Sequence, residues 1–133
     1  MADAVDTKVI QSDGKYHIAR WTNLSDGTGE AAVIKLDVST LLNANKRTAT
    51  RTRLRKISWR VQGFPRVTLL WDATTDDEIM VLAAGTGELD FDAMGIPGLL
   101  DPQSSGYTGD VLLTAPATFT TGSYDIVTVW ELI

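Results

Sequence analysis

Apolar and polar residues alternate along most of the chain, and this period of two predicts β-strands separated by turns. The clearest case is residues 66–85, where an alternating run ending at Trp71 is followed by polar or small residues and then by a second apolar run, 79–84. This pattern predicts a central β-hairpin. Both arms have apolar residues at adjacent positions, as in Leu69-Leu70, so we expect the hairpin to be buried on both faces.

Similar patterns predict the remaining strands, which cover residues 5–12, 15–23, 30–38, 53–62, 88–92, 110–115 and 123–132. The last of them has apolar residues in both phases, so it is also expected to be buried on both faces. The apolar phase changes between Ile18 and Trp21 and again between Leu54 and Ile57, which predicts a β-bulge at each place. Gly63-Phe64-Pro65 is expected to turn the chain into the central hairpin, since proline cannot donate a ladder hydrogen bond.

About eight or nine strands with turns at short intervals, and no amphipathic helix, predict an all-β fold. We expect an antiparallel β-sandwich of jelly-roll-like form, or a closed β-barrel. The 133 residues are expected to form a single β domain over 1–133, with residues 1–8 as an N-terminal arm. Residues 43–52 are polar and indicate an exposed loop, and residues 93–109, rich in Gly and Pro, indicate a long ordered loop.

The charges are distributed unevenly along the chain. Residues 1–66 hold all 12 Lys and Arg with six acids, whereas residues 67–133 hold the other eleven acids and no Lys or Arg, for a net charge of −5. Eight of the cations lie within residues 46–66, without an acid among them. One explanation is internal, because a basic strand beside acidic strands pairs its charges across the sheet. The other is external, with a basic patch that docks an acidic partner.

The residues needed for most catalytic and metal chemistry are scarce. The chain has no cysteine, its one histidine is His17, and it contains no Gly-x-Ser-x-Gly sequence. Carboxylates cluster at residues 72–78 and 90–92, but without the spacing of a calcium loop. We therefore expect a protein that is not an enzyme and has no catalytic residue, no cofactor and no bound metal.

Binding functions are harder to separate. Arginines interleaved with Trp59 and Phe64 are typical of a single-stranded nucleic-acid site, but the negative net charge disfavours that partner, so none is expected. All four tryptophans lie in strand patterns, which favours core packing. A carbohydrate-binding module would need an exposed one, for which Trp21 is the best candidate, and this alternative stays open. The acidic N-terminus and the absence of a long apolar run predict a soluble protein without an export signal or membrane partner.

Several strand-and-turn segments together resemble a family of small virion proteins of tailed bacteriophages. They are Asp26-Gly-Thr-Gly-Glu30, Val33-Ile-Lys-Leu-Asp-Val38, Leu70-Trp-Asp-Ala-Thr-Thr-Asp76, Leu89-Asp-Phe91 and Gly106-Tyr-Thr-Gly-Asp-Val-Leu-Leu113. The resemblance implies a decoration or cement protein on the capsid surface that stabilises the head shell. Its implied partners are the major capsid protein and copies of itself in a homo-oligomer. A tail, connector or baseplate component is the alternative within phage virions.

The basic segment supplies the expected contact residues. Arginine forms charge-assisted and often bidentate hydrogen bonds with carboxylates, so a group of arginines in an exposed loop suits an acidic protein surface. The expected partner-binding residues are Lys46, Arg47, Arg51, Arg53 and Arg55.

Overall fold

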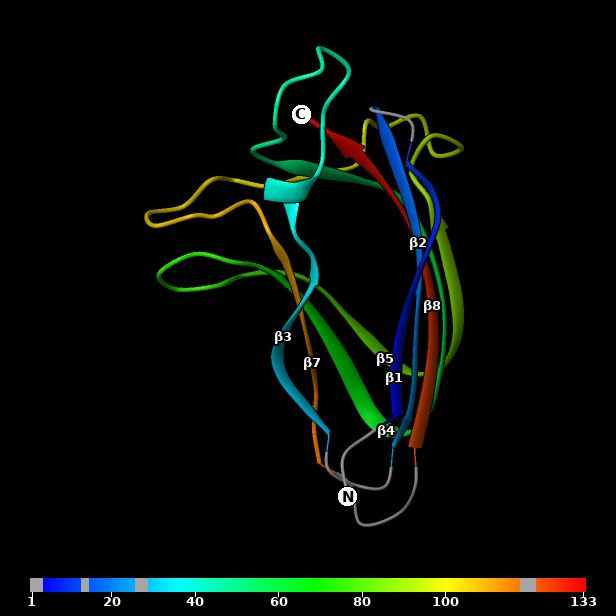
Figure 1. Ribbon diagram of the computed structural model, residues 1–133. Coiled ribbons are helices and arrows are strands. Elements are labelled where there is room, and N and C mark those ends of the chain that lie inside the picture. The colour runs from blue at the N-terminus through cyan, green and yellow to red at the C-terminus, as the bar shows by residue number, and fades with distance from the viewer. Residues whose placement is uncertain (1–3, 13–14, 26–28, 118–121) are drawn as a thin grey trace.

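The chain folds into an antiparallel β-sheet that curls into a half-barrel (Figure 1). The computed structural model describes residues 4–12, 15–25, 29–117 and 122–133. Its elements are β1 (Ala4–Ser12), β2 (Tyr16–Ser25), β3 (Glu30–Leu36), the 3₁₀ helix η1 (Val38–Thr40), β4 (Thr52–Trp71), β5 (Asp77–Asp90), β6 (Leu99–Leu100), β7 (Val111–Ala115) and β8 (Gly122–Leu132). The predicted all-β antiparallel fold and the number of strands are confirmed. No helix in these ranges has the length and apolar character needed to span a membrane.

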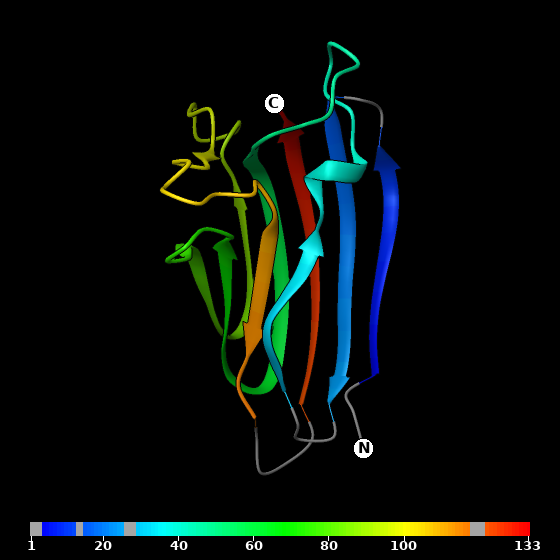
Figure 2. The same cartoon turned by 60° about the vertical axis from the view of Figure 1, so that its left-hand side comes forward.

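The long strand β4 joins the two halves of the curled sheet. Its first part, Thr52–Gln62, pairs with β8, and its last part, Thr68–Trp71, pairs with β7. β5 runs antiparallel to β4 through both parts. The strand order β1-β2-β8-β4-β7-β3 leaves β1 and β3 at the two ends of the described sheet, where the half-barrel is open (Figure 2).

The expected turn at Gly63-Phe64-Pro65 is wrong, because β4 continues through this segment. The pairing of β4 with β5 jumps from Val61 to Arg66, so the intervening residues form a bulge. Gly63 has a φ of +80°, which a glycine adopts without steric strain, and Phe64 is buried. The bulge bends the strand from β8 towards β7 instead of ending it.

The two bulges predicted from phase changes have different outcomes. The one between Leu54 and Ile57 is confirmed, since the pairing of β4 with β8 shifts between Leu54 and Lys56. The one before Trp21 is wrong, because β2 pairs with β8 in one continuous register. The inward residues of β2 are His17, Ala19, Trp21 and Asn23, which are all buried. A bulge lies on the neighbouring strand instead, between Val9 and Gln11 of β1.

The core fills the concave side of the half-barrel. At its centre the rings of Trp21 and Trp130 lie 6.4 Å apart between centroids, and both residues are fully buried. The convex side is more open than the sequence predicts. Val81 on β5 is 43% exposed, and the outward residues of β8 are only half-buried. A single curled sheet encloses one face, so apolar residues in the other phase remain near solvent.

On β3 a charged residue is buried and apolar residues are exposed, which is the reverse of what the sequence pattern predicts. Val33 and Ile34 are exposed, whereas the Lys35 side chain is 2% exposed and its Nζ lies 2.7 Å from Oε2 of Glu30. The pairing of β3 with β7 is irregular on both sides of Val33 and Ile34, which turns the lysine inward. Oε1 of the same glutamate accepts hydrogen bonds from Asn23 of β2, at 2.7 Å, and from the hydroxyl of Tyr124 of β8. These contacts connect β3 to the opposite half of the sheet.

Candidate docking surface

The end of the half-barrel opposite the start of β1 carries the longest connections of the fold. Residues 41–51 and 91–110 both lie in this half of the molecule, with the C-terminus beside the first (Figures 1 and 2). We call these two segments the loop end. Each is held in place by hydrogen bonds, so the loop end is an ordered surface and not a pair of free tails.

Within residues 41–51 the chain forms a compact turn around Asn43. The Asn43 backbone N–H donates to the carbonyl of Arg47 at 2.8 Å, and its side-chain oxygen accepts from the N–H of Asn45 at 2.9 Å. Asparagine favours such turns because its side chain bonds the backbone two residues on. Ala49 is buried and anchors the base of the turn. The exposed loop predicted here is confirmed, and Lys46 and Arg47 stand at its tip.

Residues 91–110 are fixed to the sheet at several places. Asp101 is buried, and its N–H donates to the carbonyl of Thr52 at 3.1 Å. Farther along, the Thr108 hydroxyl donates to the Asp72 carboxylate at 2.8 Å, and Gly106 packs so closely on Thr74 that a Cβ would lie 2.0 Å from its hydroxyl oxygen. The long ordered loop predicted from Gly and Pro content is confirmed, with the short strand β6 within it.

Five of the twelve large apolar side chains that are exposed among the described residues lie on the loop end. Loop residues ordinarily place polar groups in water, so exposed apolar side chains on ordered loops are candidates for contact with a second molecule. The exposed set on these two segments is Leu42, Met94, Ile96, Leu100 and Tyr107. Sequence reasoning missed them because they follow no strand or helix period and are scattered through residues assigned to loops.

The structure separates the five cations expected to bind a partner. Lys46 and Arg47 are exposed, and no ion pair within the described ranges involves either. Arg51 donates to the backbone carbonyl of Asp101. Arg53 and Arg55 are partly buried and share Glu131, with nitrogen–oxygen distances of 3.1 and 3.4 Å, and Arg55 also pairs with Asp92. Only the first two are therefore placed to meet a second molecule without losing an internal contact.

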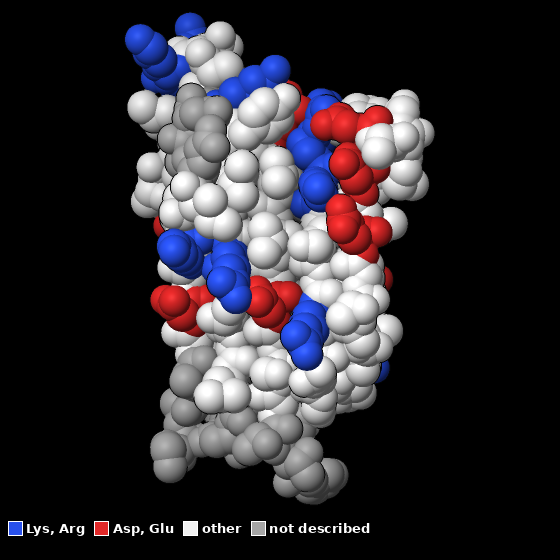
Figure 3. All heavy atoms as spheres, turned by 90° about the vertical axis from the view of Figure 1, so that its right-hand side faces the viewer, with Lys and Arg blue, Asp and Glu red and all other residues white. Residues whose placement is uncertain are grey.

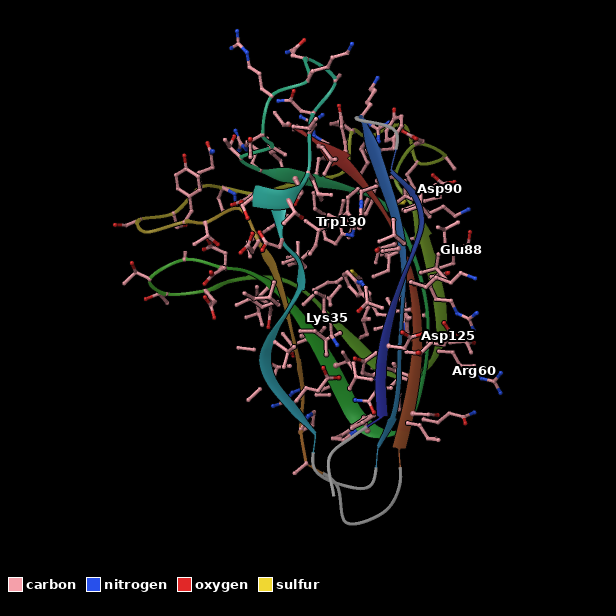
Figure 4. All side chains as sticks on the ribbon, viewed as in Figure 1. Lys35, Arg60, Glu88, Asp90, Asp125 and Trp130 are labelled. Carbon is pink, nitrogen blue, oxygen red and sulfur yellow. The ribbon has the colours of Figure 1, made fainter. Side chains whose placement is uncertain are left out.

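Charge pairing across the sheet continues on the convex face, so the internal explanation of the charge distribution is confirmed. Arg20 of β2 meets Asp125 of β8 at 2.6 Å, and Lys56 of β4 meets Glu88 of β5 at 3.2 Å. In Figure 3 this face shows acidic and basic clusters side by side. Figure 4 shows Arg60 and Asp125 projecting outward, whereas Lys35 and Trp130 point into the space between the strands.

A groove lies on the convex face along these charge pairs. It has a volume of about 360 Å³, with apolar and aromatic residues from β2 and β8 on one side and charged residues of β4 and the end of β5 on the other. Its lining is Tyr16, Ile18, Val129, Arg55, Lys56, Asp90 and Asp92. The aromatic residue here is Tyr16, whereas the sequence pointed to Trp21, which is buried.

The structure also places His17 and the carboxylates that the sequence offered as candidates for catalysis or metal binding. Burial lowers the pKa of His17, whose side chain faces the interior on β2. The described residues contain no group of three or more His, Cys, Asp or Glu side chains arranged to hold a metal.

Replacing Asp110 with asparagine is expected to stabilise the protein near neutral pH by about 1 kcal/mol. Burial raises the pKa of Asp110, and the nearby Asp37 and Asp72 carboxylates raise it further. A raised folded-state pKa means that stability is lost as pH rises from the ordinary value of about 3.9 through that raised value. Asparagine carries no charge and can still accept from the Val38 N–H, which lies 3.0 Å from the carboxylate.

Denaturant unfolding of Asp110→Asn and the parent protein over a series of pH values measures this effect. The advantage of the variant should shrink as pH falls through the raised pKa, because the parent carboxylate then becomes neutral as well. An advantage that grew towards acid pH would contradict the assignment.

Comparison with known proteins gives only distant likenesses. No protein-family model matches the chain, and no curated protein is significantly similar to it in sequence. A cupin superfamily protein from Desulfitobacterium hafniense is 7% identical, with a TM-score of 0.38, over 100% of this chain and 81% of that one. A family 11 carbohydrate-binding module from Clostridium thermocellum, in complex with a mixed-linked tetrasaccharide, is 14% identical, with a TM-score of 0.26, over 99% and 84%.

The capsular polysaccharide assembling protein CapF from Staphylococcus aureus is also 14% identical, with a TM-score of 0.27. The match covers 95% of this chain but only 28% of that protein. The TM-scores of all three likenesses lie below 0.5, so the functions of these proteins do not transfer to the chain.

Proposed function

We propose that the chain is a non-enzymatic virion structural protein, a capsid decoration or cement protein that docks on a phage head shell through its loop end. The observation that carries the proposal is the ordered loop end itself, where exposed apolar residues lie on the same two segments as Lys46 and Arg47, two exposed cations that pair with no acid in the described part of the chain. The sequence resemblance to small tailed-phage virion proteins supports the same role.

The physical properties of the loop end suit a protein partner. Apolar contacts supply binding free energy at the centre of an interface, and charges at its rim set orientation and partner choice. Loops already fixed by hydrogen bonds lose little conformational entropy on binding. The Lys46 and Arg47 side chains, which form no ion pair with another described residue, fit an acidic patch that is repeated at each lattice position of the shell.

Co-sedimentation of the purified protein with empty shells of the parent phage tests this function. Saturable binding, with a number of copies set by the shell lattice, is expected. Binding restricted to tail or connector assemblies would contradict the capsid role and indicate a tail or connector component instead. Absence of binding to any virion component would overturn the proposal.

The convex groove favours a second candidate, a carbohydrate-binding module. An aromatic side chain beside apolar residues and a set of charged hydrogen-bonding groups is a common arrangement in saccharide sites. In this groove Tyr16 would stack on a sugar ring while Arg55 and Asp90 bond its hydroxyls. Titration with a panel of neutral oligosaccharides, followed by NMR, should show binding that Tyr16→Ala removes, and an unchanged spectrum throughout would reject this candidate.

A further inference from the structure

The edge strand β1 has a pattern that is complementary to itself. Its residues Val5, Thr7 and Val9 lie opposite the buried residues Asn23, Trp21 and Ala19 of β2, so they face the concave side, and Asp6 and Lys8 face the convex side. All five are exposed, with Val5 at 42% and Val9 at 53%. Figure 2 shows β1 at the margin of the sheet, where no described strand covers its outer edge.

We propose that two copies of the chain pair antiparallel through β1, about a two-fold axis at Thr7. In this register Val5 of one copy lies opposite Val9 of the other, Asp6 lies opposite Lys8, and the two threonines face each other. Apolar pairs, threonine pairs and opposite charges are all favourable cross-strand neighbours. The two sheets become one continuous sheet, and the main-chain groups at the edge gain hydrogen-bond partners.

The charges select this register over its neighbours. A two-fold axis perpendicular to the sheet keeps the concave faces of the two copies on the same side. Residues that lie opposite each other must therefore come from the same face, so the neighbouring registers differ by two residues and are centred on Asp6 or on Lys8. Centring the axis on Asp6 places Asp6 opposite itself, and centring it on Lys8 places Lys8 opposite itself. Like charges directly opposite are unfavourable. Lys8 also lies opposite Arg20 within its own chain, so an acidic neighbour on the other side relieves a repulsion.

The other exposed edges are poorer templates for pairing. β3 has exposed Val33 and Ile34, but it is irregular, with Ala32 at a φ of 46° and two register shifts against β7. The free side of β5 carries acids at both of its ends, which repel one another in a self-pair. β1 is regular from Ala4 to Val9, up to its bulge. This inference does not depend on the shell-binding role.

Single cysteines test the pairing directly, because the chain has none of its own. Residues opposite each other across the axis have Cβ atoms about 4.5–5.5 Å apart, close enough for oxidative cross-linking with slight adjustment. Thr7→Cys should give a covalent dimer under mild oxidation. Val5→Cys and Val9→Cys should each form no covalent dimer alone and should give a covalent dimer when the two are mixed. Ala44→Cys, exposed on the loop end, is the control.

Thr7→Cys that forms no more dimer than Ala44→Cys would overturn the pairing, and Val5→Cys that dimerises alone as well as in the mixture would overturn the register.

Charge exchange gives a second measurement without cross-linking. By sedimentation equilibrium, Asp6→Lys should weaken self-association about tenfold, because both charge pairs become repulsive. Adding Lys8→Asp to this variant should restore the parent affinity, and a double variant as weak as the single one would contradict the proposal.

Discussion

Lys35→Met is expected to lower the free energy of unfolding by about 3–5 kcal/mol at pH 7, because it leaves a charge buried without its partner. The Lys35 and Glu30 side chains are 2% and 5% exposed, and their charged atoms are 2.7 Å apart. Methionine fills much the same volume, so the expected loss comes from the stranded Glu30 carboxylate and not from a cavity.

The double variant Glu30→Gln, Lys35→Met separates these two causes. Glutamine is neutral, and its side-chain oxygen can still accept from Asn23 and Tyr124, as Oε1 of Glu30 does. We expect the free energy of unfolding of the double variant to lie within about 1–2 kcal/mol of that of the parent, since replacing a whole buried ion pair is often nearly neutral. Chemical denaturation of the parent, the single variants Lys35→Met and Glu30→Gln, and the double variant gives the coupling free energy. A double variant as unstable as Lys35→Met would contradict the pair as described.

Replacing both Lys46 and Arg47 with glutamate is expected to weaken shell binding about 100-fold, because each reversal places like charges together at the proposed contact. Both residues are exposed at the tip of the turn, so the thermal midpoint should stay nearly unchanged. A binding isotherm on empty shells, combined with the unfolding curve, measures the two effects separately.

Arg60→Glu with Arg66→Glu is the matched control. These two arginines are also exposed and basic, lie on β4 away from the loop end, and change the net charge by the same amount. The control pair should bind shells almost as the parent does. Equal losses in the two double variants would indicate attraction by net charge alone and would reject a specific role for the loop end.

Much of the fold follows from the period-two pattern, because strand alternation is a local property of the chain. The hairpin of β4 and β5 and the bulge after Leu54 were predictable for this reason. The strand over residues 30–38 was predicted, but its inward-facing residue was not, since a lysine turns inward only where tertiary structure brings it a buried acid and two further polar groups. Gly63-Phe64-Pro65 has the composition of a turn, but its bulge is set by the need of β4 to pair with both β8 and β7.

The docking surface was predictable only in part. The density of cations in residues 46–66 led to the predicted partner-binding residues, but which of these cations are already paired within the chain depends on strand neighbours far away in sequence. Arg53 and Arg55 meet Glu131 because β4 lies against β8. The exposed apolar residues, such as Met94 and Ile96, had no periodic signal and emerge only from the fold.

Electron cryo-microscopy of shells decorated with the protein, at a resolution that orients the half-barrel, would show directly whether the protein docks through its loop end. We expect one small β domain at each equivalent lattice position, with residues 41–51 and 91–110 against the shell and the opposite end away from it. Density in which the loop end points to solvent, or shells without any added density at saturating protein, would contradict this expectation.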